Sequence, residues 1–301
     1  MQQHTYQTLL DVSKRVNWRI DDIIGGDKKL NFSKPFLPET FARTEALAFL
    51  SDGERLTLNH IRAHGYLAMF GLVEECILPF VNMAIEHDAG EPHRVPALLQ
   101  FAEEEVKHME LFRRFRREFA AGFGSECGFI GPPEAVRDAF LAHQPMAVAI
   151  ATLGIEWMSQ AHYVESVRDD ADLDPQFKSL LKHHWQEESQ HARIDALLLK
   201  ELARSTTPEK VDRAIDEYFE IGAFLDGGLK SLAQLDLESF ERTTGRALTP
   251  DQQEQFLHVQ HQALRWTFLG SAMRNKNFLA ALGELSPKAR ARVEEASAMF
   301  C

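Results

Sequence analysis

Residues 182–193 read KHHWQEESQHAR, and this stretch decides the fold. It carries Glu188 and His191 as a Glu-x-x-His pair, with His184 four residues before the glutamate. An α-helix turns about 100° per residue, so relative to His184 the glutamate lies near +40° and His191 near about −20°. All three side chains therefore point from one narrow face of a helix. Such a face can supply part of a metal site, and other helices must complete it.

A second Glu-x-x-His pair lies upstream in FAEEEVKHMELF, where Glu105 and His108 have the same spacing. Two more glutamates interrupt apolar helical runs, Glu74 in MFGLVEECILPF and Glu156 in VAIATLGIEWM. The order along the chain is Glu, Glu-x-x-His, Glu, Glu-x-x-His. That order is typical of a carboxylate-bridged two-metal site inside a four-helix bundle.

The start signals of helices recur along the chain as a capping residue followed by proline or by an apolar periodic run. Strand-like alternation, a glycine-rich phosphate loop and a low-complexity linker are not found in the sequence. We therefore expect one all-α domain over residues 1–301, with a core bundle at about 51–204, an N-terminal helix and loop in 1–50 and C-terminal helices in 205–301. The expected helices are 5–24, a short one from about 39, 51–87, 96–122, 133–143, 145–169, 174–203, 207–237, 249–282 and 286–300.

Composition narrows the functional classes. The 301 residues carry a net charge of −12, which argues against a nucleic-acid or anionic-membrane surface. No uninterrupted apolar run reaches the roughly 18 residues of a membrane span, and the N-terminus lacks a signal-peptide pattern. Cys76, Cys127 and Cys301 are an odd number without close spacing. They indicate a reducing cytoplasm and neither a disulfide framework nor a zinc motif.

The residue types suit two iron ions about 3.5–4 Å apart, although manganese also fits such a set. Glutamate is long enough to reach the bundle centre and can bridge two cations, and neutral histidine adds one nitrogen to each metal. In the usual arrangement Glu105 and Glu188 bridge. Glu74 and His108 complete the coordination of one metal ion, and Glu156 and His191 complete that of the other. Open positions are then left for dioxygen.

Other interpretations of these residues stay open. Glu75 lies about 100° from Glu74 and is not excluded as the ligand. Solvated charged faces are also compatible with the run 103–105 and with Glu187 and Glu188. His184 is either a seventh ligand or a surface histidine, since Phe101 stands at the corresponding position of the first pair. Carboxylates on apolar faces, by contrast, cost several kcal/mol (roughly) unless they are paired or bind metal.

The pattern resembles the ferritin-like di-iron carboxylate superfamily. With His184 as one histidine beyond the standard six ligands, it is similar to the p-aminobenzoate N-oxygenase family. The resemblance implies a ferritin-like four-helix bundle and a cytoplasmic homodimer. It also implies dioxygen activation at two iron ions and oxidation of a small organic substrate, an aryl amine in that family. An external electron donor is implied too, because no flavin or nicotinamide motif is visible. The ligands implied are Glu74, Glu105, His108, Glu156, His184, Glu188 and His191.

Several other functions are compatible with the same sequence. Within the superfamily they are a ferroxidase, a manganese catalase and a radical-generating reductase subunit, for which Tyr163 would be the radical candidate. Outside it, a non-enzymatic helical scaffold would need no metal. Trp157 and Trp185 are neighbours of expected ligands and are candidates to flank the site.

Overall fold

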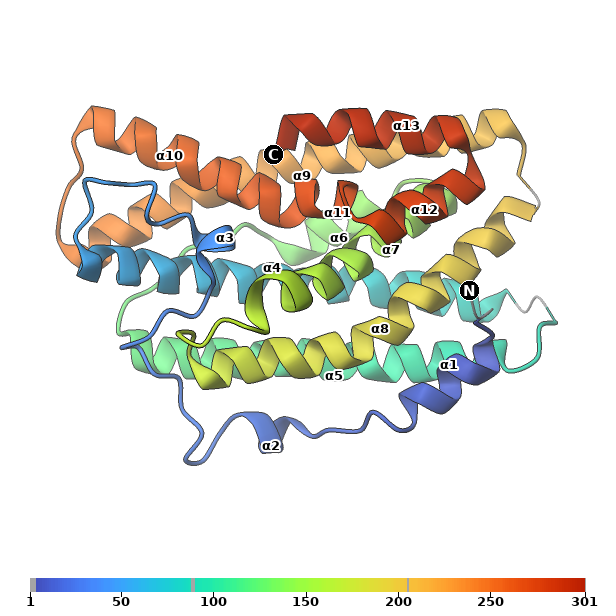
Figure 1. Ribbon diagram of the computed structural model, residues 1–301, viewed down its shortest axis with the longest axis horizontal. Helices are drawn as coiled ribbons and strands as arrows, with labels where there is room; N and C mark the ends of the chain where they lie inside the picture. The colour runs from blue at the N-terminus through green and yellow to red at the C-terminus, as the bar shows by residue number, and fades with distance from the viewer. Residues whose placement is uncertain (1–3, 88–89, 205, 301) are drawn as a thin grey trace.

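The computed structural model describes residues 4–87, 90–204 and 206–300, and Cys301 lies outside them. Within this part of the chain the regular elements are helices, joined by turns and one isolated bridge between Gly25 and Lys28 (Figure 1). The elements are α1 (Tyr6–Ser13), α2 (Ile20–Ile23), α3 (Glu39–Ala42), α4 (Asp52–Glu86), α5 (Arg94–Phe123), α6 (Pro133–Leu141), α7 (Pro145–Ala161), η1 (His162–Val167), α8 (Pro175–Arg204), α9 (Pro208–Thr244), α10 (Pro250–Arg265), η2 (Trp266–Gly270), α11 (Ser271–Met273), α12 (Lys276–Leu285), α13 (Pro287–Ala296) and η3 (Ser297–Phe300).

Four long helices form the core, and they are the four that carry the predicted ligands. α4 packs along α5, α7 packs along α8, and the two pairs face each other across the bundle centre (Figure 1). The remaining helices cover this core from the N-terminal and C-terminal sides. The expected all-α four-helix bundle with additional helices is confirmed for the part of the chain that the structure describes.

The sequence signals for helix starts act as expected. The Ser51 side chain accepts from the Glu54 backbone N–H and Glu54 returns the bond to Ser51, a capping box that begins α4. At the start of α8, Asp174 Oδ1 accepts from the Phe177 backbone N–H at 2.7 Å. These caps satisfy amide groups that the helix itself cannot bond. They fix where each ligand-bearing helix begins, and therefore which side chains reach the centre.

Helix α9 lies along the outer side of α4 and α7, so these two helices have neighbours on two sides. A buried ion pair anchors it, with Arg62 Nη1 of α4 at 3.1 Å from Asp236 Oδ2 of α9. Removing one partner of such a pair typically costs about 3–5 kcal/mol of stability. α9 runs to Thr244, farther than the expected end near residue 237, and Gly245 at φ 67° stops it.

Two expected helices are broken. The predicted helix 5–24 is α1 and α2 with an irregular segment between them, because Trp18 turns inward and packs against His108 in the core. The predicted helix 249–282 passes through the π-helical turn η2 and stops at Arg274. Asn275 then caps a new helix by accepting from the N–H groups of Asn277 and Phe278. Local hydrophobic periodicity does not reveal these breaks, since their causes are tertiary contacts and a cap inside the pattern.

α4 is also the one described helix that is long and apolar enough to cross a membrane by length and composition, with a window of mean hydropathy 1.6. In the structure half of that window is buried, and the helix is a wall of the bundle. The sequence search for uninterrupted apolar runs missed this window. Glu74 interrupts it and points to the bundle centre.

Candidate metal centre

The seven predicted ligands come from all four core helices. α4 supplies Glu74, α5 supplies Glu105 and His108, α7 supplies Glu156, and α8 supplies His184, Glu188 and His191. Each of them is at most 4% exposed. Residues that are up to 117 positions apart in the chain (191 − 74) thus meet in the middle of the bundle.

Two overlapping groups of these side chains have the geometry of metal sites. Glu74, His108, His184 and Glu188 form one group, and Glu105, His108, Glu188 and His191 form the other. Within each group one nitrogen or oxygen atom per residue lies within 4.8 Å of all the others. His108 and Glu188 belong to both groups, which are therefore adjacent, as two metal ions with shared ligands would require.

Atoms without a hydrogen-bond partner test whether metal fits here. At least one oxygen of each of the four glutamates and Nδ1 of both His108 and His191 are buried without one. His108 Nδ1 lies 3.0 Å from Glu188 Oε1, and His191 Nδ1 lies 2.9 Å from Glu105 Oε1, without hydrogen-bond geometry. Buried groups of this kind are normally satisfied. Converging lone pairs that lack donors fit cations, so the residues present suit two metal ions.

The outward nitrogens of the two histidines are held by glutamates of the facing helix. His108 Nε2 lies 3.0 Å from Glu187 Oε2, and His191 Nε2 lies 2.8 Å from Glu104 Oε2. A carboxylate at Nε2 fixes the proton there and leaves Nδ1 as the free lone pair that a metal needs. The contacts cross between α5 and α8, since Glu104 precedes Glu105 and Glu187 precedes Glu188.

These supporting glutamates are themselves held. The Lys107 ammonium pairs with Glu187, and the Ser13 hydroxyl donates to Glu104. Trp18 stacks on the His108 ring with centroids 6.1 Å apart. The sequence interpretation missed Glu104 and Glu187 and left them as solvated charges, yet both are at most 2% exposed. A signal was present, because both motifs read Glu-Glu-x-x-His.

Two choices that the sequence left open are clarified by position. His184 is 4% exposed, and its Nε2 lies 3.0 Å from Glu74 Oε1 and 3.1 Å from Glu188 Oε1, so it is no surface histidine. Glu75 points away from the centre and its Oε1 pairs with Arg113 Nη2 at 3.4 Å. The structure therefore places Glu74, and not Glu75, among the candidate ligands.

The carboxylates differ in proton affinity. Burial, and then the charge of Glu105, raises the pKa of Glu74 well above its usual value, and burial with the charge of Glu188 does the same for Glu156. Burial also opposes ionisation of Glu105, but the interaction with the neighbouring Glu74 carboxyl and the charge of His191 outweigh it and lower the pKa to about 2. Without metal, Glu74 and Glu156 therefore keep their protons, while Glu105 and Glu188, whose pKa values are lowered, carry charge.

The pKa values of His108 and His191, the two histidines held by glutamates of the facing helix, depend on the same opposing effects of burial and nearby charge. Burial disfavours their charged forms, yet the surrounding glutamates raise the pKa of both His108 and His191 well above the usual value. Asp195, one turn beyond His191, is 1% exposed with neither oxygen hydrogen-bonded. Burial raises its pKa well above the usual range. These are features of a site whose charge is incomplete without cations.

The aromatic residues that the sequence suggested make other contacts. Tyr163 belongs to the π-helical turn η1, and its ring packs against Trp185 with centroids 4.8 Å apart. The Trp157 carbonyl accepts a hydrogen bond from Asn275. The rings that pack on the candidate ligand histidines include Phe101 on His191, at 4.0 Å between centroids, Trp18 on His108, and Phe112 on His184 at 5.1 Å. The aromatic neighbours of the cluster therefore differ from those that the sequence suggested.

Comparison with known proteins gives structural neighbours only. No family model matches the chain, and no curated protein sequence matches it. Solved structures that align with it include a variant of an R2-like ligand-binding oxidase with aerobically reconstituted Mn/Fe cofactor, at 15% identity and a TM-score of 0.47, covering 88% of this chain and 94% of that one. Another variant of that oxidase, with Fe/Fe cofactor, aligns at 16% identity and a TM-score of 0.49, covering 88% and 93%.

Proposed function

We propose that this protein is a non-haem di-iron oxidoreductase that uses dioxygen to oxidise a small organic substrate. The observation that carries the proposal is the set of buried glutamate oxygens and histidine Nδ1 atoms that face one another without hydrogen-bond partners. Two bound iron ions would supply the redox chemistry with dioxygen. Manganese fits the same ligands, so a mixed centre is part of the proposal.

The protein's own residues hold and shield this centre. Glu188 belongs to both ligand groups and Glu105 to one of them, and their carboxylates would offset the charge of two cations. Glu104 and Glu187 keep the protons of His191 and His108 on Nε2. Phe101 covers the His191 ring and keeps bulk water from it. Dry, pre-oriented surroundings strengthen every charge interaction in the site.

The finer proposal is that the reaction is oxygenation of the nitrogen of an aryl amine. Its support is the third histidine, His184, which lies beside Glu74 and Glu188 as the resemblance to the N-oxygenase family requires. One oxygen atom would go to the substrate and the other would leave as water, with two electrons from an external donor. A cytoplasmic homodimer is proposed on the same resemblance.

The test begins with metal content. Protein purified from iron-supplemented cells is expected to hold about two metal ions per chain, since the two ligand groups overlap as in a two-metal site. The reduced protein should then consume dioxygen and convert an aryl amine to its hydroxylamine. Folded protein without stoichiometric metal would contradict the two-metal proposal. Metal with oxygen consumption but oxidation at carbon would leave only the N-oxygenation proposal contradicted.

His184→Ala tests the seventh ligand, and His183→Ala is its matched control. His183 is the neighbouring residue, and its Nδ1 bonds the Ser179 carbonyl at 2.7 Å, away from the cluster. Loss of His184 is expected to weaken binding of the metal ion that Glu74 would hold, while loss of His183 should leave both metal ions bound. Equal metal content in the two variants would show that His184 is not a ligand.

A further inference from the structure

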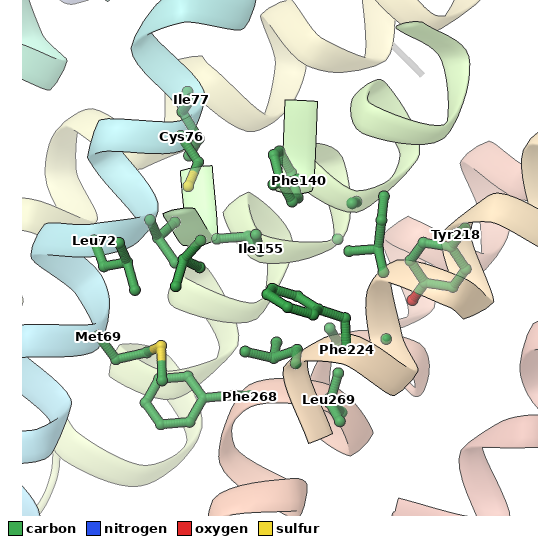
Figure 2. A pocket seen from close by; sticks show the side chains of 18 of the residues that line it. Met69, Leu72, Cys76, Ile77, Phe140, Ile155, Tyr218, Phe224, Phe268 and Leu269 are labelled. Carbon is green, nitrogen blue, oxygen red and sulfur yellow. The ribbon is translucent and has the colours of Figure 1, made fainter. Parts of the chain in front are cut away.

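A second buried space lies on the other side of α4 and α7 from the metal centre. It is a cavity of about 80 Å³, enclosed by α4, α7, α9 and η2 (Figure 2). Val73 and Cys76 line it from α4, Ile155 from α7, Tyr218 from α9 and Phe268 from η2. The same two helices thus present glutamates to the cluster and apolar side chains to this cavity. α4 and α7 are the shared wall.

The lining is apolar with one clear exception. Among the described residues that line the cavity none is charged, and apart from the Cys76 thiol the one polar side-chain group is the Tyr218 hydroxyl. Figure 2 shows that hydroxyl among hydrocarbon side chains. Tyr218 is 7% exposed, and burial raises its pKa while no hydrogen bond contributes. A buried tyrosine hydroxyl usually has a partner. This one is available to a ligand.

The cavity has a route to solvent past Phe224 of α9. Phe224 lines the cavity and is 49% exposed, which is unusual for a residue of its size. Together with Val136 and Leu225 it also lines a neighbouring surface groove near Ile130. An exposed aromatic side chain at the junction of a groove and an apolar cavity is a feature of ligand entrances.

We propose that this cavity binds an uncharged, largely apolar organic molecule with one hydrogen-bonding group held by Tyr218. The proposal goes beyond the proposed function, because α4 and α7 separate the cavity from the cluster, so a molecule held here is a bound ligand and not the molecule that is oxidised. An anionic ligand is disfavoured, since burying a carboxylate without a cation or donor is strongly unfavourable. A neutral aryl amine or alcohol fits, whereas an aminobenzoate does not.

Matched ligand pairs that differ in charge test this class directly. Equilibrium dialysis of the metal-loaded protein at pH 7 would compare aniline with 4-aminobenzoate, and hexanol with hexanoate. The neutral member of each pair is expected to bind at least about 10-fold more tightly, because only the carboxylate must lose its hydration without a partner. Equal or tighter binding of the carboxylates would overturn the proposal.

A cavity-filling variant locates the binding. Gly222 lines the cavity, and a Cβ there would meet nothing closer than Met273 Cε at 4.0 Å, so Gly222→Leu extends into the space without a clash at its base. Gly227→Leu is the control, since it makes the same change on the exposed side of α9 with open space around it. Gly222→Leu should abolish binding of the neutral ligands. If it binds them as Gly227→Leu does, the ligand site is elsewhere.

Tyr218→Phe tests the hydrogen bond alone. It should lower the affinity for hexanol by about fivefold and leave the affinity for hexane unchanged, because only the hydrogen bond to the hydroxyl is lost. An equal effect on both ligands would show a packing role and overturn the assignment of Tyr218. Metal content is measured on every sample. A protein that binds neutral ligands but holds no metal would refute the proposed function, and metal without ligand binding would refute only the cavity.

Discussion

The inner and outer faces of α4 and α7 make a useful comparison. The inner faces present Glu74 and Glu156, whose buried oxygens lack hydrogen-bond partners, and the outer faces present Val73 and Ile155 around an apolar cavity. Both regions are buried and both are incomplete, but in opposite ways. The inner one lacks positive charge and the outer one lacks apolar atoms. Two sides of one helix can therefore be built for an ion and for an organic molecule.

The largest effect is expected when the inner face loses its charge. In the double variant Glu105→Gln and Glu188→Gln the side chains keep their shape but no longer neutralise or bridge cations. Metal content measured by atomic emission should fall from about two ions per chain to near zero, since both ligand groups lose an anionic member.

The apo form of this double variant sharpens the comparison. Its free energy of unfolding in urea should not fall, because removing carboxylate charge relieves repulsion between buried groups. Gly222→Leu, which changes only the outer cavity, is the control and should retain both metals. Retained metal in the double variant would show that the inner glutamates are structural, as a helical scaffold would have them.

A smaller effect is expected from the glutamates that hold the histidines. Glu104→Gln or Glu187→Gln should weaken metal binding by about 10- to 100-fold, because the ring loses the carboxylate that fixes its tautomer. Competition with a chelator measures the affinity. Glu103→Gln is the matched control, since Glu103 is the exposed neighbour in the same run. Equal metal affinities in the three variants would contradict the role of Glu104 and Glu187 in orienting the histidines.

The protonation of the inner face predicts a pH dependence for the metal-free protein. The raised pKa values of Glu74 and Glu156 mean that the folded chain keeps protons that the unfolded chain has lost, so the free energy of unfolding falls as pH rises. The raised pKa values of His108 and His191 act in the same direction above about pH 6.5. The lowered pKa of Glu105 adds a pH-independent amount to the free energy of unfolding in this range, because Glu105 is ionised in both the folded and the unfolded chain at neutral pH.

Urea unfolding with chelator at pH 6.5, 7.5 and 8.5 checks this slope, whose limit is about 1.4 kcal/mol per proton and pH unit. Metal binding should reverse it, since the ligands must lose their protons and affinity rises with pH. Release of protons on adding metal would be seen in weakly buffered solution. Metal-free stability that rises with pH would contradict the proton assignment.

The smallest effect is expected at Glu75, which lies between the two faces. Its carboxylate is partly exposed beside Arg113, and surface pairs of this kind contribute at most about 1 kcal/mol. Glu75→Gln should therefore keep both metals and nearly all of the stability, while Glu74→Gln loses at least one metal. Atomic emission and urea unfolding of the pair would distinguish them. Similar metal loss in both would mean that the helix face is misassigned.

The inner face could be predicted from the sequence because a glutamate in an apolar run is conspicuous and the Glu-x-x-His spacing is regular. The starts of α4 and α8 followed from their capping residues and a first-turn proline, whereas α5 begins at Arg94, two residues before the expected start at Pro96. The outer cavity could not be predicted, since Val73, Ile155 and Phe268 look like any core residues. A cavity forms where side chains from several helices leave a gap between them, and the local sequence pattern of one helix does not encode such a gap.

The supporting residues were only partly predictable. Glu104 and Glu187 looked like surface charges because a run of acidic residues on a helix is usually solvated, and their contacts cross to another helix. Trp18 was missed because its expected helix is broken by the contact that brings it to His108. Long-range contacts of this kind decide the details of the site, whereas helix pattern decides its outline.

The crossed contacts of the two motifs also bear on how the chain could have evolved. The spacing from single glutamate to motif glutamate is 31 residues in the first half and 32 in the second, so the halves look like copies of one unit. Yet Glu104 of the first half holds His191 of the second, and Glu187 holds His108. Neither copy retains an oriented histidine by itself. Once such contacts had formed, the halves could no longer be separated or replaced independently, and a mutation in one would select for compensation in the other.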